Sequence, residues 1–403
     1  MSRRAIVKLG NLPVGRLLES DDARIEFRLD PDYQAMPRRP VLGQWFEDRQ
    51  REIQRGDRPG ELPAFFANLF PEGDLRLTIQ ERLGVPVGDD LGLLCAVGTD
   101  LPGALVVELE SGEPAIAPPA TTPEPDDGGL RFSLAGVQLK FSMVRGADRF
   151  HMPGRDEHGG WIAKISYDVF PDLGANEWTT MEWARRMGFD VPTTELRPLA
   201  DLIDAPYAGA PEAQVFLIQR YDRAAGHQRV HQEDFQQIVG RRPDKKYSDM
   251  TYDKLVFLAT RIVGGATYRE LLRRLAFVVA SGNDDAHMKN WSVVYPDGVT
   301  ARLSPLYDQV FTARWPQFAV SLALKVDGAK DFASLDLGNF REMARRIGES
   351  EAETAGIVEQ TIVEAANAWH GLRDHPHVSD VYREALQRHW RKVPLLRPHA
   401  LAI

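Results

Sequence analysis

The spacing of apolar side chains divides the chain into segments of different predicted structure. Near the N-terminus, short runs alternate apolar and polar residues, as half-buried strands do. These runs cover residues 5–9, 12–18 and 25–29. Helical spacing follows at residues 62–69, 75–83 and 91–97, and a last strand is predicted at 103–109. The pattern predicts a compact α+β unit of about a hundred residues, a normal size for one domain.

A proline-rich stretch interrupts these patterns at residues 111–129. Its sequence, SGEPAIAPPATTPEPDDGG, holds five prolines and almost no side chains that could pack into a core. Such a composition resists both helix and sheet, which predicts an exposed linker. A long surface loop within one domain is the alternative.

Beyond this stretch, predicted strands surround one predicted helix. The strands are at residues 130–134, 139–144, 160–165 and 214–219, and the helix covers 175–187 with Gly188 as its C-cap. From about residue 250 the periodicity becomes mostly helical, for example at 268–280, 340–347 and 354–369. The predicted order is strands, one helix, more strands and then helices. This is the order found in the small and large lobes of a protein kinase.

Composition narrows the class of protein further. The 403 residues carry 58 acidic and 49 basic side chains, a net charge of -9, which argues against binding of nucleic acid by this chain alone. Cys95 is the only cysteine, so an intrachain disulfide and a cysteine-based zinc site are both excluded. Without a signal-peptide pattern or an apolar run long enough for a membrane span, we expect a cytoplasmic protein with no membrane partner.

Candidate chemistry is concentrated in the loop after the apolar helix that ends at Ala280. Asp285 and Asn290 are separated by four residues. In the catalytic loop of protein kinases an Asp and an Asn at this spacing orient the attacking hydroxyl and hold a magnesium ion. The spacing alone is weak, because a loop in which Asp and Asn cap a helix has the same composition.

Two later features strengthen the catalytic interpretation. A hairpin is predicted at residues 291–303 around the turn Pro296-Asp297-Gly298. It leads to Asp308, which lies just past a strand end, where the second magnesium-binding acid of a kinase is found. Asn290 and Asp308 are therefore the predicted metal ligands.

A lysine on a predicted strand completes the set. Lys164 lies among apolar neighbours, where a contact with ATP phosphates is expected, and Glu177 on the next helix is a candidate ion-pair partner. Glu182 on the same helix is an alternative partner. The segment 133–140 has one glycine and fits neither a G-x-G-x-x-G loop nor a Walker A motif, so its composition indicates a hairpin.

The catalytic segments resemble the HipA-type serine/threonine kinases. Residues 282–290 resemble the family's G-N-x-D-x-H-x-K-N loop, and 304–308 resemble its metal-binding L-x-P-x-Y-D segment. Residues 133–140 resemble its S-x-x-G-x-Q-x-K phosphate loop, and 219–223 its E-R-F-D-R hinge, with Gln219 in place of glutamate.

Two further segments extend the resemblance over nearly the whole chain. Residues 231–235 fit a segment common in the family, and 62–73 resemble its N-terminal, antitoxin-contacting subdomain. The resemblance implies ATP and Mg²⁺ as cofactors. Ser133, Gly136 and Gln138 are expected to cover the phosphates, with Ser133 also the site of autophosphorylation. Adenine is expected at the backbone of Gln219 and Tyr221.

The resemblance also implies a biological role. Family members halt growth by phosphorylating a serine on a translation factor, typically an aminoacyl-tRNA synthetase. A helix-turn-helix antitoxin binds such a kinase, and DNA is reached only through that antitoxin. His287 and Lys289 in the catalytic loop suit either loop packing or stabilisation of the transferred charge.

We therefore expect an α+β, bilobal protein-kinase-like fold preceded by a small α+β subdomain. The predicted parts are the N-terminal subdomain 1–110, the linker 111–129, the small lobe 130–224 with its β-sheet, and the mostly helical large lobe 225–403.

Three other functions remain open. The first is a small-molecule phosphotransferase that uses the same Asp and Asn, although it has no need of the N-terminal unit. The second is a catalytically silent corepressor partner, which the intact catalytic set disfavours. The third is a metal-dependent hydrolase built on Asp284, Asp285 and His287, which lacks a second histidine at ligand spacing.

Overall fold

The computed structural model describes residues 3–49, 51–70, 73–110, 138–153, 159–166, 170, 172–203, 209–224, 228–248, 250–315 and 321–403. The chain forms two compact units, each assembled from separate stretches of sequence. Unit 1 comprises Met1–Leu139, Tyr221–Lys246 and Ser292–Arg302, and unit 2 comprises Lys140–Arg220, Tyr247–Trp291 and Leu303–Ile403. The predicted linker at 111–129, the predicted strand at 130–134 and the phosphate-loop residues Ser133 and Gly136 lie outside the described residues.

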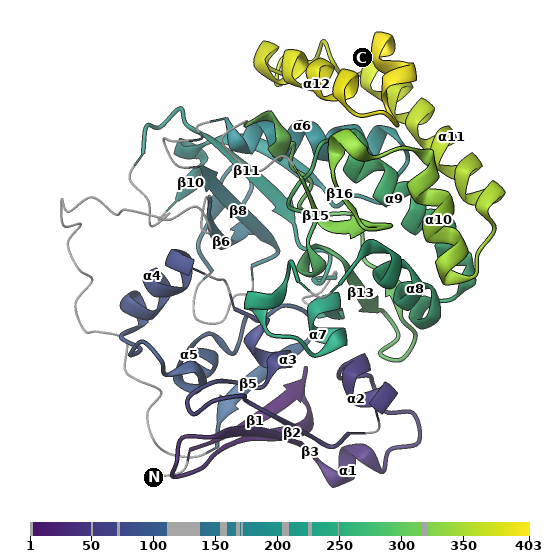
Figure 1. The fold of residues 1–403 in the computed structure, drawn as a ribbon. Helices are drawn as coiled ribbons and strands as arrows, with labels where there is room; N and C mark the ends of the chain where they lie inside the picture. The colour runs from purple at the N-terminus through teal and green to yellow at the C-terminus, as the bar shows by residue number, and fades with distance from the viewer. Residues whose placement is uncertain are drawn as a thin grey trace. The chain divides into compact units, whose positions relative to one another are not determined.

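Unit 1 is built on a five-stranded antiparallel sheet with the order β4-β3-β2-β1-β5, of which Figure 1 labels β1, β2, β3 and β5. Its strands are β1 Arg4–Leu9, β2 Leu12–Glu19, β3 Ile25–Leu29, β4 Ile53–Arg55 and β5 Leu105–Leu109. Its helices before residue 100 are α1 Pro31–Gln34, α2 Gln44–Arg49, α3 Ala64–Ala67, α4 Gly73–Leu83 and α5 Asp90–Val97. The alternating pattern of β3 places Ile25, Phe27 and Leu29 on its buried face, as period-two strands require.

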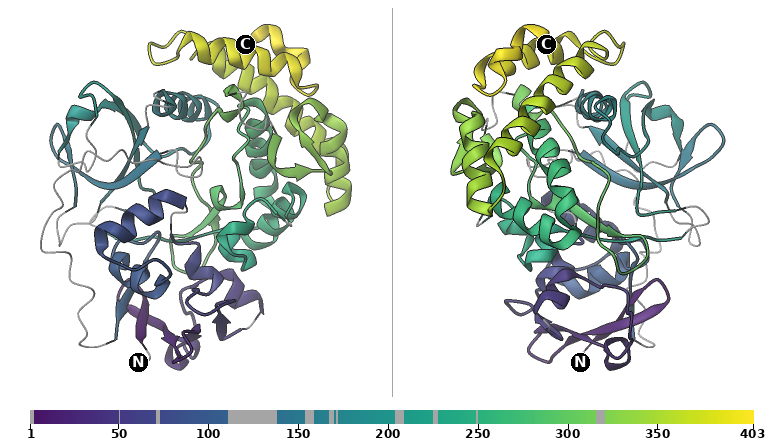
Figure 2. Two further views of the ribbon diagram at one scale, coloured as in Figure 1. Left: turned by 60° about the vertical axis from the view of Figure 1, so that its left-hand side comes forward. Right: turned by 90° about the vertical axis from the view of Figure 1, so that its right-hand side faces the viewer.

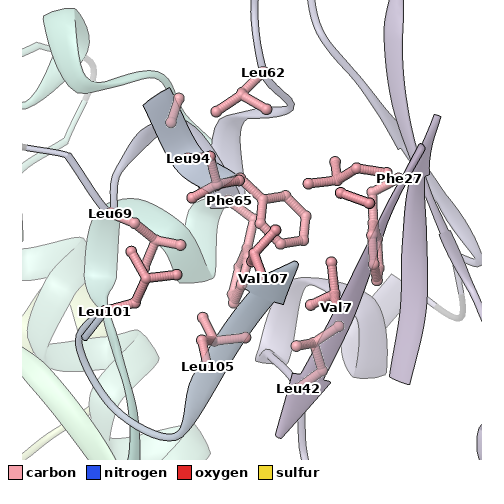
Figure 3. Packing of buried hydrophobic residues seen from close by; sticks show 14 of the residues in the cluster. Val7, Phe27, Leu42, Leu62, Phe65, Leu69, Leu94, Leu101, Leu105 and Val107 are labelled. Carbon is pink, nitrogen blue, oxygen red and sulfur yellow. The ribbon is translucent and has the colours of Figure 1, made fainter. Parts of the chain in front are cut away.

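Side chains from this sheet, α3 and α5 meet in one apolar core (Figure 3). Phe27, Phe65 and Val107 are fully buried within it. Phe27 packs at 4.8 Å between ring centroids against Phe66, in a tilted arrangement that aromatic pairs favour. The N-terminal unit thus has its own hydrophobic core, as a domain does.

Two later stretches of the chain also belong to unit 1. They contain β12 His231–Asp234 and β13 Ser292–Tyr295, which belong to a three-stranded sheet with the order β12-β13-β14, where β14 is Arg302–Leu303. Helix α7, Phe235–Val239, follows β12 and begins with a capping box between Asp234 and Gln237. It ends at Gly240, which has a φ of +68° and lies so close to the Trp45 ring that a Cβ atom would overlap it, so only glycine fits.

Unit 2 contains a six-stranded sheet with the order β10-β7-β6-β8-β11-β9. Its strands are β6 Gln138–Arg145, β7 Phe150–His151, β8 Trp161–Ser166, β9 Thr194–Pro198, β10 Leu202–Ile203 and β11 Gln214–Gln219. Helix α6, Leu173–Arg186, lies against β8, β9 and β11 (Figure 2). Its C-cap residue Met187 is followed by Gly188 at a φ of +80°, so the predicted glycine stop is confirmed.

The rest of unit 2 is mostly helical. Its helices are α8 Tyr252–Val263, α9 Tyr268–Ala280, α10 Leu337–Ile347, α11 Glu351–His370 and α12 Asp380–Lys392, and a short hairpin joins β15 Ser321–Val326 to β16 Ala329–Asp331. Most residues of helix α9 are buried, and the helix packs against α8 and α11. Figures 1 and 2 both show α10 and α11 side by side. None of the helices in the described ranges combines the length and apolar character that crossing a bilayer requires.

The predicted elements agree with the structure where periodicity was strong. The strands predicted at 25–29 and 214–219 match β3 and β11, and the helix predicted at 268–280 matches α9. The predicted hairpin at 291–303 is shorter than expected: Asp297 accepts hydrogen bonds from the backbone of Val299 and Thr300, which extends the turn and leaves only Arg302 and Leu303 to pair.

Candidate active site

The candidate catalytic loop begins where α9 ends. Gly282 follows the helix with a φ of +61°, and a Cβ atom there would lie 2.8 Å from the Phe311 ring. Both conditions exclude other residues, since L side chains avoid positive φ and since the ring leaves no room. The glycine therefore sets the direction in which residues 283–290 leave the helix.

Hydrogen bonds within the loop fix its shape. Asn283 Oδ1 accepts from the backbone N–H of Asp285 at 3.0 Å, and Asn290 Nδ2 donates to the Asp285 carbonyl at 3.0 Å. Tyr252 and Trp291 both donate to the Ala286 carbonyl, at 2.9 and 3.2 Å. The Asp285 side chain is exposed while its neighbours from Ala286 to Met288 are buried. A rigid loop thus presents one carboxylate to solvent.

The segment that carries Asp308 is joined directly to this loop. Tyr307 donates from its hydroxyl to the Lys289 carbonyl at 2.9 Å, and the backbone N–H of Ala313 donates to the Gly282 carbonyl at 3.0 Å. Asp308 itself has a φ of +55°, a conformation that non-glycine residues rarely adopt and that Asp tolerates better than most. The two predicted catalytic segments are therefore held together by hydrogen bonds within unit 2.

A buried lysine links the sheet, helix α6 and Asp308. Lys164 on β8 is 5% exposed, and its Nζ lies 2.5 Å from Glu177 Oε1 and 2.5 Å from Asp308 Oδ1. The predicted pairing of Lys164 with Glu177 is confirmed. The alternative partner, Glu182, instead pairs with Arg185 and Arg186 on its own helix.

The charges of this cluster favour an ionised Asp308. Burial tends to raise the pKa of Asp308, but the nearby charges of Lys140 and Lys164 and the hydrogen bond from Lys164 outweigh burial and hold the pKa well below its usual range. Burial raises the pKa of Glu177, and Lys164 only partly offsets this. Burial tends to lower the pKa of Lys164, but its two carboxylate partners raise it overall, so the ammonium stays protonated.

Asn176, which the sequence analysis did not single out, positions Glu177. Its Oδ1 accepts from the backbone N–H of Phe311 at 2.8 Å, and its Nδ2 donates to the Phe311 carbonyl at 3.1 Å. This double hydrogen bond fastens α6 to the segment just after Asp308 and places the Glu177 carboxylate beside Lys164. Nothing in the local sequence marks Asn176, because an asparagine on a helix is common and its partner is 135 residues away.

Tyr247 was also missed by the sequence analysis. Its hydroxyl donates to Asp285 Oδ1 at 2.5 Å, and its ring makes an edge contact with His287, with centroids 5.3 Å apart. On the other side of the loop, burial and the charge of Asp285 raise the pKa of Asp284 to about 6, although a hydrogen bond with Thr312 opposes this. Asp284 and Asp285 thus lie in different environments despite being adjacent.

The remaining predicted residues are placed as follows. His287 is buried and Lys289 half-buried, and both stay candidates for the roles predicted for them. Gln219 is exposed at the end of β11 in unit 2, and Tyr221 in unit 1 donates its hydroxyl to Gln232. Gln138 opens β6. The adenine and phosphate-loop roles of these residues stay predictions.

A metal site in this unit would be made of oxygen atoms. Among the described residues, no cluster of three or more His, Cys, Asp and Glu side chains is arranged to hold a metal ion. No described residue donates to Asn290 Oδ1 or to Asp308 Oδ2, whereas Asn290 Nδ2 and Asp308 Oδ1 are engaged. Carboxylate and amide oxygens of this kind are the ligands that Mg²⁺ prefers.

Comparison with solved structures defines the class of protein. The chain matches HipA in the complex of HipA, HipB and operator DNA from Shewanella oneidensis, with a TM-score of 0.76, 20% sequence identity and coverage of 98% of this chain and 96% of that chain. The predicted fold class is confirmed: this is a mixed α+β, protein-kinase-like fold with an N-terminal α+β subdomain.

Sequence comparison then identifies the family. The model of the HipA-like C-terminal domain matches residues 132–369, and that of the HipA N-terminal domain matches residues 5–108. Y4dM of Sinorhizobium fredii, a protein named as a candidate kinase, is 32% identical over 98% of both chains. The HipA serine/threonine-protein kinase toxin of Shewanella oneidensis is 25% identical over 86% of this chain and 88% of its own length. The chain belongs to the HipA family of kinase toxins.

Proposed function

We propose that this chain is an ATP- and Mg²⁺-dependent serine/threonine protein kinase that acts as the toxin of a toxin–antitoxin pair. The observation that carries the proposal is the buried contact of Lys164 with both Glu177 and Asp308. Protein kinases need the lysine–glutamate pair and the metal-binding aspartate in place together for transfer. A structural ion pair alone would not require Asp308 at a strained, positive φ.

Each residue then has a defined role. The acceptor hydroxyl attacks the γ-phosphorus of ATP, a new oxygen–phosphorus bond forms, the bond to the β-phosphate oxygen breaks, and ADP leaves. Asp285 accepts the hydroxyl proton and orients the attacking oxygen. Lys164 contacts the phosphates, and Glu177 holds its ammonium in position. Ser133, Gly136 and Gln138 are the proposed cover over the phosphates, with Ser133 as the autophosphorylation site.

The residues that would hold Mg²⁺ are Asn290 and Asp308. Each has one side-chain oxygen that accepts no hydrogen bond from the described residues, and the low pKa of Asp308 keeps its carboxylate negative at any physiological pH. When bound, Mg²⁺ supplies charge neutralisation between the transferring phosphates. The donor set therefore fits the ion.

The proposed partners follow from the family. The matched structure is a complex of HipA with HipB and operator DNA, so we propose that this chain binds a helix-turn-helix antitoxin of the HipB type and reaches DNA only through it. The net charge of -9 supports indirect contact with DNA. The proposed target is a serine on a translation factor such as an aminoacyl-tRNA synthetase.

Induced expression with phosphoproteomics tests the proposal. The wild-type chain, Asp285→Asn and the control Asp374→Asn are compared. Asp374 is a highly exposed loop residue, so its variant should match the wild type. We expect growth arrest and a new phosphoserine on a translation enzyme with the wild type and the control. In Asp285→Asn, loss of the general base should lower the transfer rate by about 10²-fold to 10⁴-fold.

Other outcomes favour the alternatives. A phosphorylated sugar or antibiotic without a protein phosphosite would indicate a small-molecule phosphotransferase. Equal growth effects from the wild type and Asp285→Asn, with no ATP turnover by either, would indicate a catalytically silent corepressor.

A further inference from the structure

Helix α6, which carries Glu177, begins beside the strand that carries Lys164. The backbone N–H of Gly174 in its first turn donates to Ser166 Oγ at 3.1 Å, and Ser166 is the last residue of β8. The first N–H groups of a helix have no partner within the helix, and here a side chain from the sheet supplies one. The start of α6 is therefore attached to the strand of Lys164.

Asp172 is the N-cap residue of α6 but does not act as a cap. An aspartate at this position ordinarily accepts a hydrogen bond from the backbone N–H of the second or third helical residue. Within the ranges that the structure describes, the Asp172 carboxylate makes no such bond. It pairs instead with the guanidinium of Arg314, a residue 142 positions further along the chain. This carboxylate thus joins α6 to a distant segment of unit 2.

The ion pair is enclosed on the side of the arginine. The side chain of Arg314 is 8% exposed, against 36% for that of Asp172. Its guanidinium lies 4.8 Å from the centroid of the Trp315 ring, and this ring makes an edge contact with Phe170 at 5.4 Å between centroids. A pair that is partly shielded from water is screened less than an exposed pair. Loss of Asp172 would leave an enclosed cation without its counter-ion.

The segment that contains Arg314 is itself fastened to the candidate catalytic loop. Arg314 is the last residue of a short 3₁₀ helix, Thr312–Arg314. Thr312 Oγ1 accepts from the backbone N–H of Asp284 at 2.7 Å, and the bond from Ala313 to the Gly282 carbonyl lies next to it. Arg314 is therefore a fixed point to which α6 is attached.

Asp172 and Asn176 attach α6 to this segment at two points. The ion pair with Arg314 and the double hydrogen bond with Phe311 start from residues four positions apart, and residues at this spacing lie on one face of a helix. Two attachments on one face oppose rotation of α6 about its axis more strongly than a single attachment does. The direction of the Glu177 side chain depends on that rotation, since Glu177 directly follows Asn176.

We infer that Arg314 is a positioning residue for phosphate transfer: through Asp172 it fixes the rotation of α6 that places Glu177 beside Lys164. This rests on the proposed function, in which Lys164 contacts the phosphates. Without the ion pair α6 can turn, the contact between Glu177 and Lys164 is populated less, and the ammonium is held less often toward the phosphates. The assignment gives the segment after Asp308 a second task besides carrying a metal ligand.

Hydrogen exchange of the α6 amides, measured by mass spectrometry on the full chain, tests the attachment. Asp172→Asn removes the charge but keeps a residue that caps helices as well as aspartate does, and Arg314→Gln removes the other partner. The control Arg345→Gln breaks an exposed ion pair with Glu342 within α10. We expect exchange in α6 to be about threefold to tenfold faster in the first two variants and unchanged in the control. Because Asp172 is partly exposed, its variant should fold even if Arg314→Gln does not.

Kinetics of the same variants test the role in transfer. In Asp172→Asn we expect kcat to fall about tenfold or more and KM for the protein acceptor to change by less than about twofold, since Asp285 is untouched. Added to Glu177→Gln, the same substitution should cause no further loss, because it acts through Glu177. Wild-type kcat and α6 exchange in Asp172→Asn, or losses that multiply in the double variant, overturn the positioning role alone. A wild-type chain that transfers phosphate to no acceptor overturns the proposed function, and the role of Arg314 in transfer with it.

Discussion

Two enclosed carboxyl groups, one in each unit, have pKa values shifted in opposite directions, although burial raises the pKa of both. In unit 2 Asp308 accepts a hydrogen bond from Lys164 at 2.5 Å and lies 4.0 Å from Lys140, and its pKa is held well below the usual range. In unit 1 Glu233 is 1% exposed and has only neutral hydrogen-bond partners, namely the Tyr295 hydroxyl at 2.5 Å and the backbone N–H of Gln44 at 2.9 Å. Burial raises its pKa to about 8, although both hydrogen bonds oppose this.

The difference shows what a carboxylate needs in order to remain charged in an interior. Neutral donors stabilise the anion less than burial destabilises it, whereas two ammonium groups reverse the balance. Glu233 can remain uncharged while it hydrogen-bonds both Gln44 and Tyr295 of β13. Asp308 can serve as a permanently charged metal ligand. Substitution of each carboxyl group, or of one of its hydrogen-bond partners, tests these two roles separately.

The largest expected effect follows from removing the charge of Asp308. Asp308→Asn keeps the size of the side chain but not the negative charge that would hold Mg²⁺. We expect phosphate transfer to fall by about 10³-fold or more, because electrostatic stabilisation of the transferring group is the main catalytic term. Transfer of radiolabelled γ-phosphate measures it, with Asp374→Asn as the matched control. Retention of more than a tenth of the activity would remove Asp308 from the metal site.

Removing Lys164 should affect both activity and stability. Lys164→Met leaves Glu177 fully buried without its cation, and an uncompensated buried charge typically costs about 3 kcal/mol. We expect a fall in the free energy of unfolding of about that size, measured by urea denaturation, and a decrease in kcat/KM of about 10²-fold. The double variant Lys164→Met/Glu177→Gln should recover most of the stability and none of the activity. Recovery of both would assign the pair a purely structural role.

Glu233 gives a smaller effect that depends on pH. Its folded-state pKa of about 8 lies above the unfolded value of 4.5, so the folded state binds more protons between these values and its stability falls as pH rises through this window. Glu233→Gln removes that loss, because a neutral amide needs no proton. The melting temperature of the variant relative to the wild type should therefore increase from pH 5 to pH 8.5. A difference that is constant with pH would show that Glu233 is ionised in the folded protein.

His231, two residues before Glu233 on β12, contributes to the pH dependence of stability with the opposite sign. Burial lowers its pKa to about 4 although its ring nitrogen contacts the Leu42 carbonyl at 2.8 Å. Its contribution is complete above the unfolded value of 6.5 and is lost as pH falls toward 4. Comparing Glu233→Gln with the wild type at each pH cancels this histidine, which both chains contain.

The candidate catalytic residues were predictable where the signal is local. The loop 282–290 places Asp285 and Asn290 through a short, fixed spacing, and the strand pattern around Lys164 marks a lysine among apolar neighbours. For the partner of Lys164 the sequence offered Glu177 with Glu182 as an alternative, and it could not decide between them. Glu177 and Glu182 differ by five positions, about 140° around a helix, and periodicity does not tell which side faces the sheet.

Long-range features could not be predicted from the sequence. Pairing of β12 with β13, which makes residues 231–234 and 292–295 part of unit 1, joins segments about sixty residues apart, a contact that no local pattern specifies. The double hydrogen bond of Asn176 with Phe311 also joins residues far apart in the sequence, and so does the contact of Tyr247 with Asp285. These residues contact the candidate site, and their side chains resemble ordinary surface or helix residues in the sequence.

The smallest expected effect compares two tyrosines that make the same bond. Tyr295 donates to buried Glu233 and Tyr247 donates to exposed Asp285, each at 2.5 Å. Tyr295→Phe leaves a buried carboxyl with one partner fewer, and we expect a loss of about 1–3 kcal/mol in unfolding free energy. Tyr247→Phe should leave the unfolding free energy within about 0.5 kcal/mol and lower the KM for a protein acceptor by about threefold, because the acceptor hydroxyl no longer has to displace a phenol. Urea denaturation and steady-state kinetics on both variants measure this. If Tyr247→Phe instead raised KM, the tyrosine would be helping to bind the acceptor, and the Tyr247–Asp285 bond would be part of the substrate site and not a block on it.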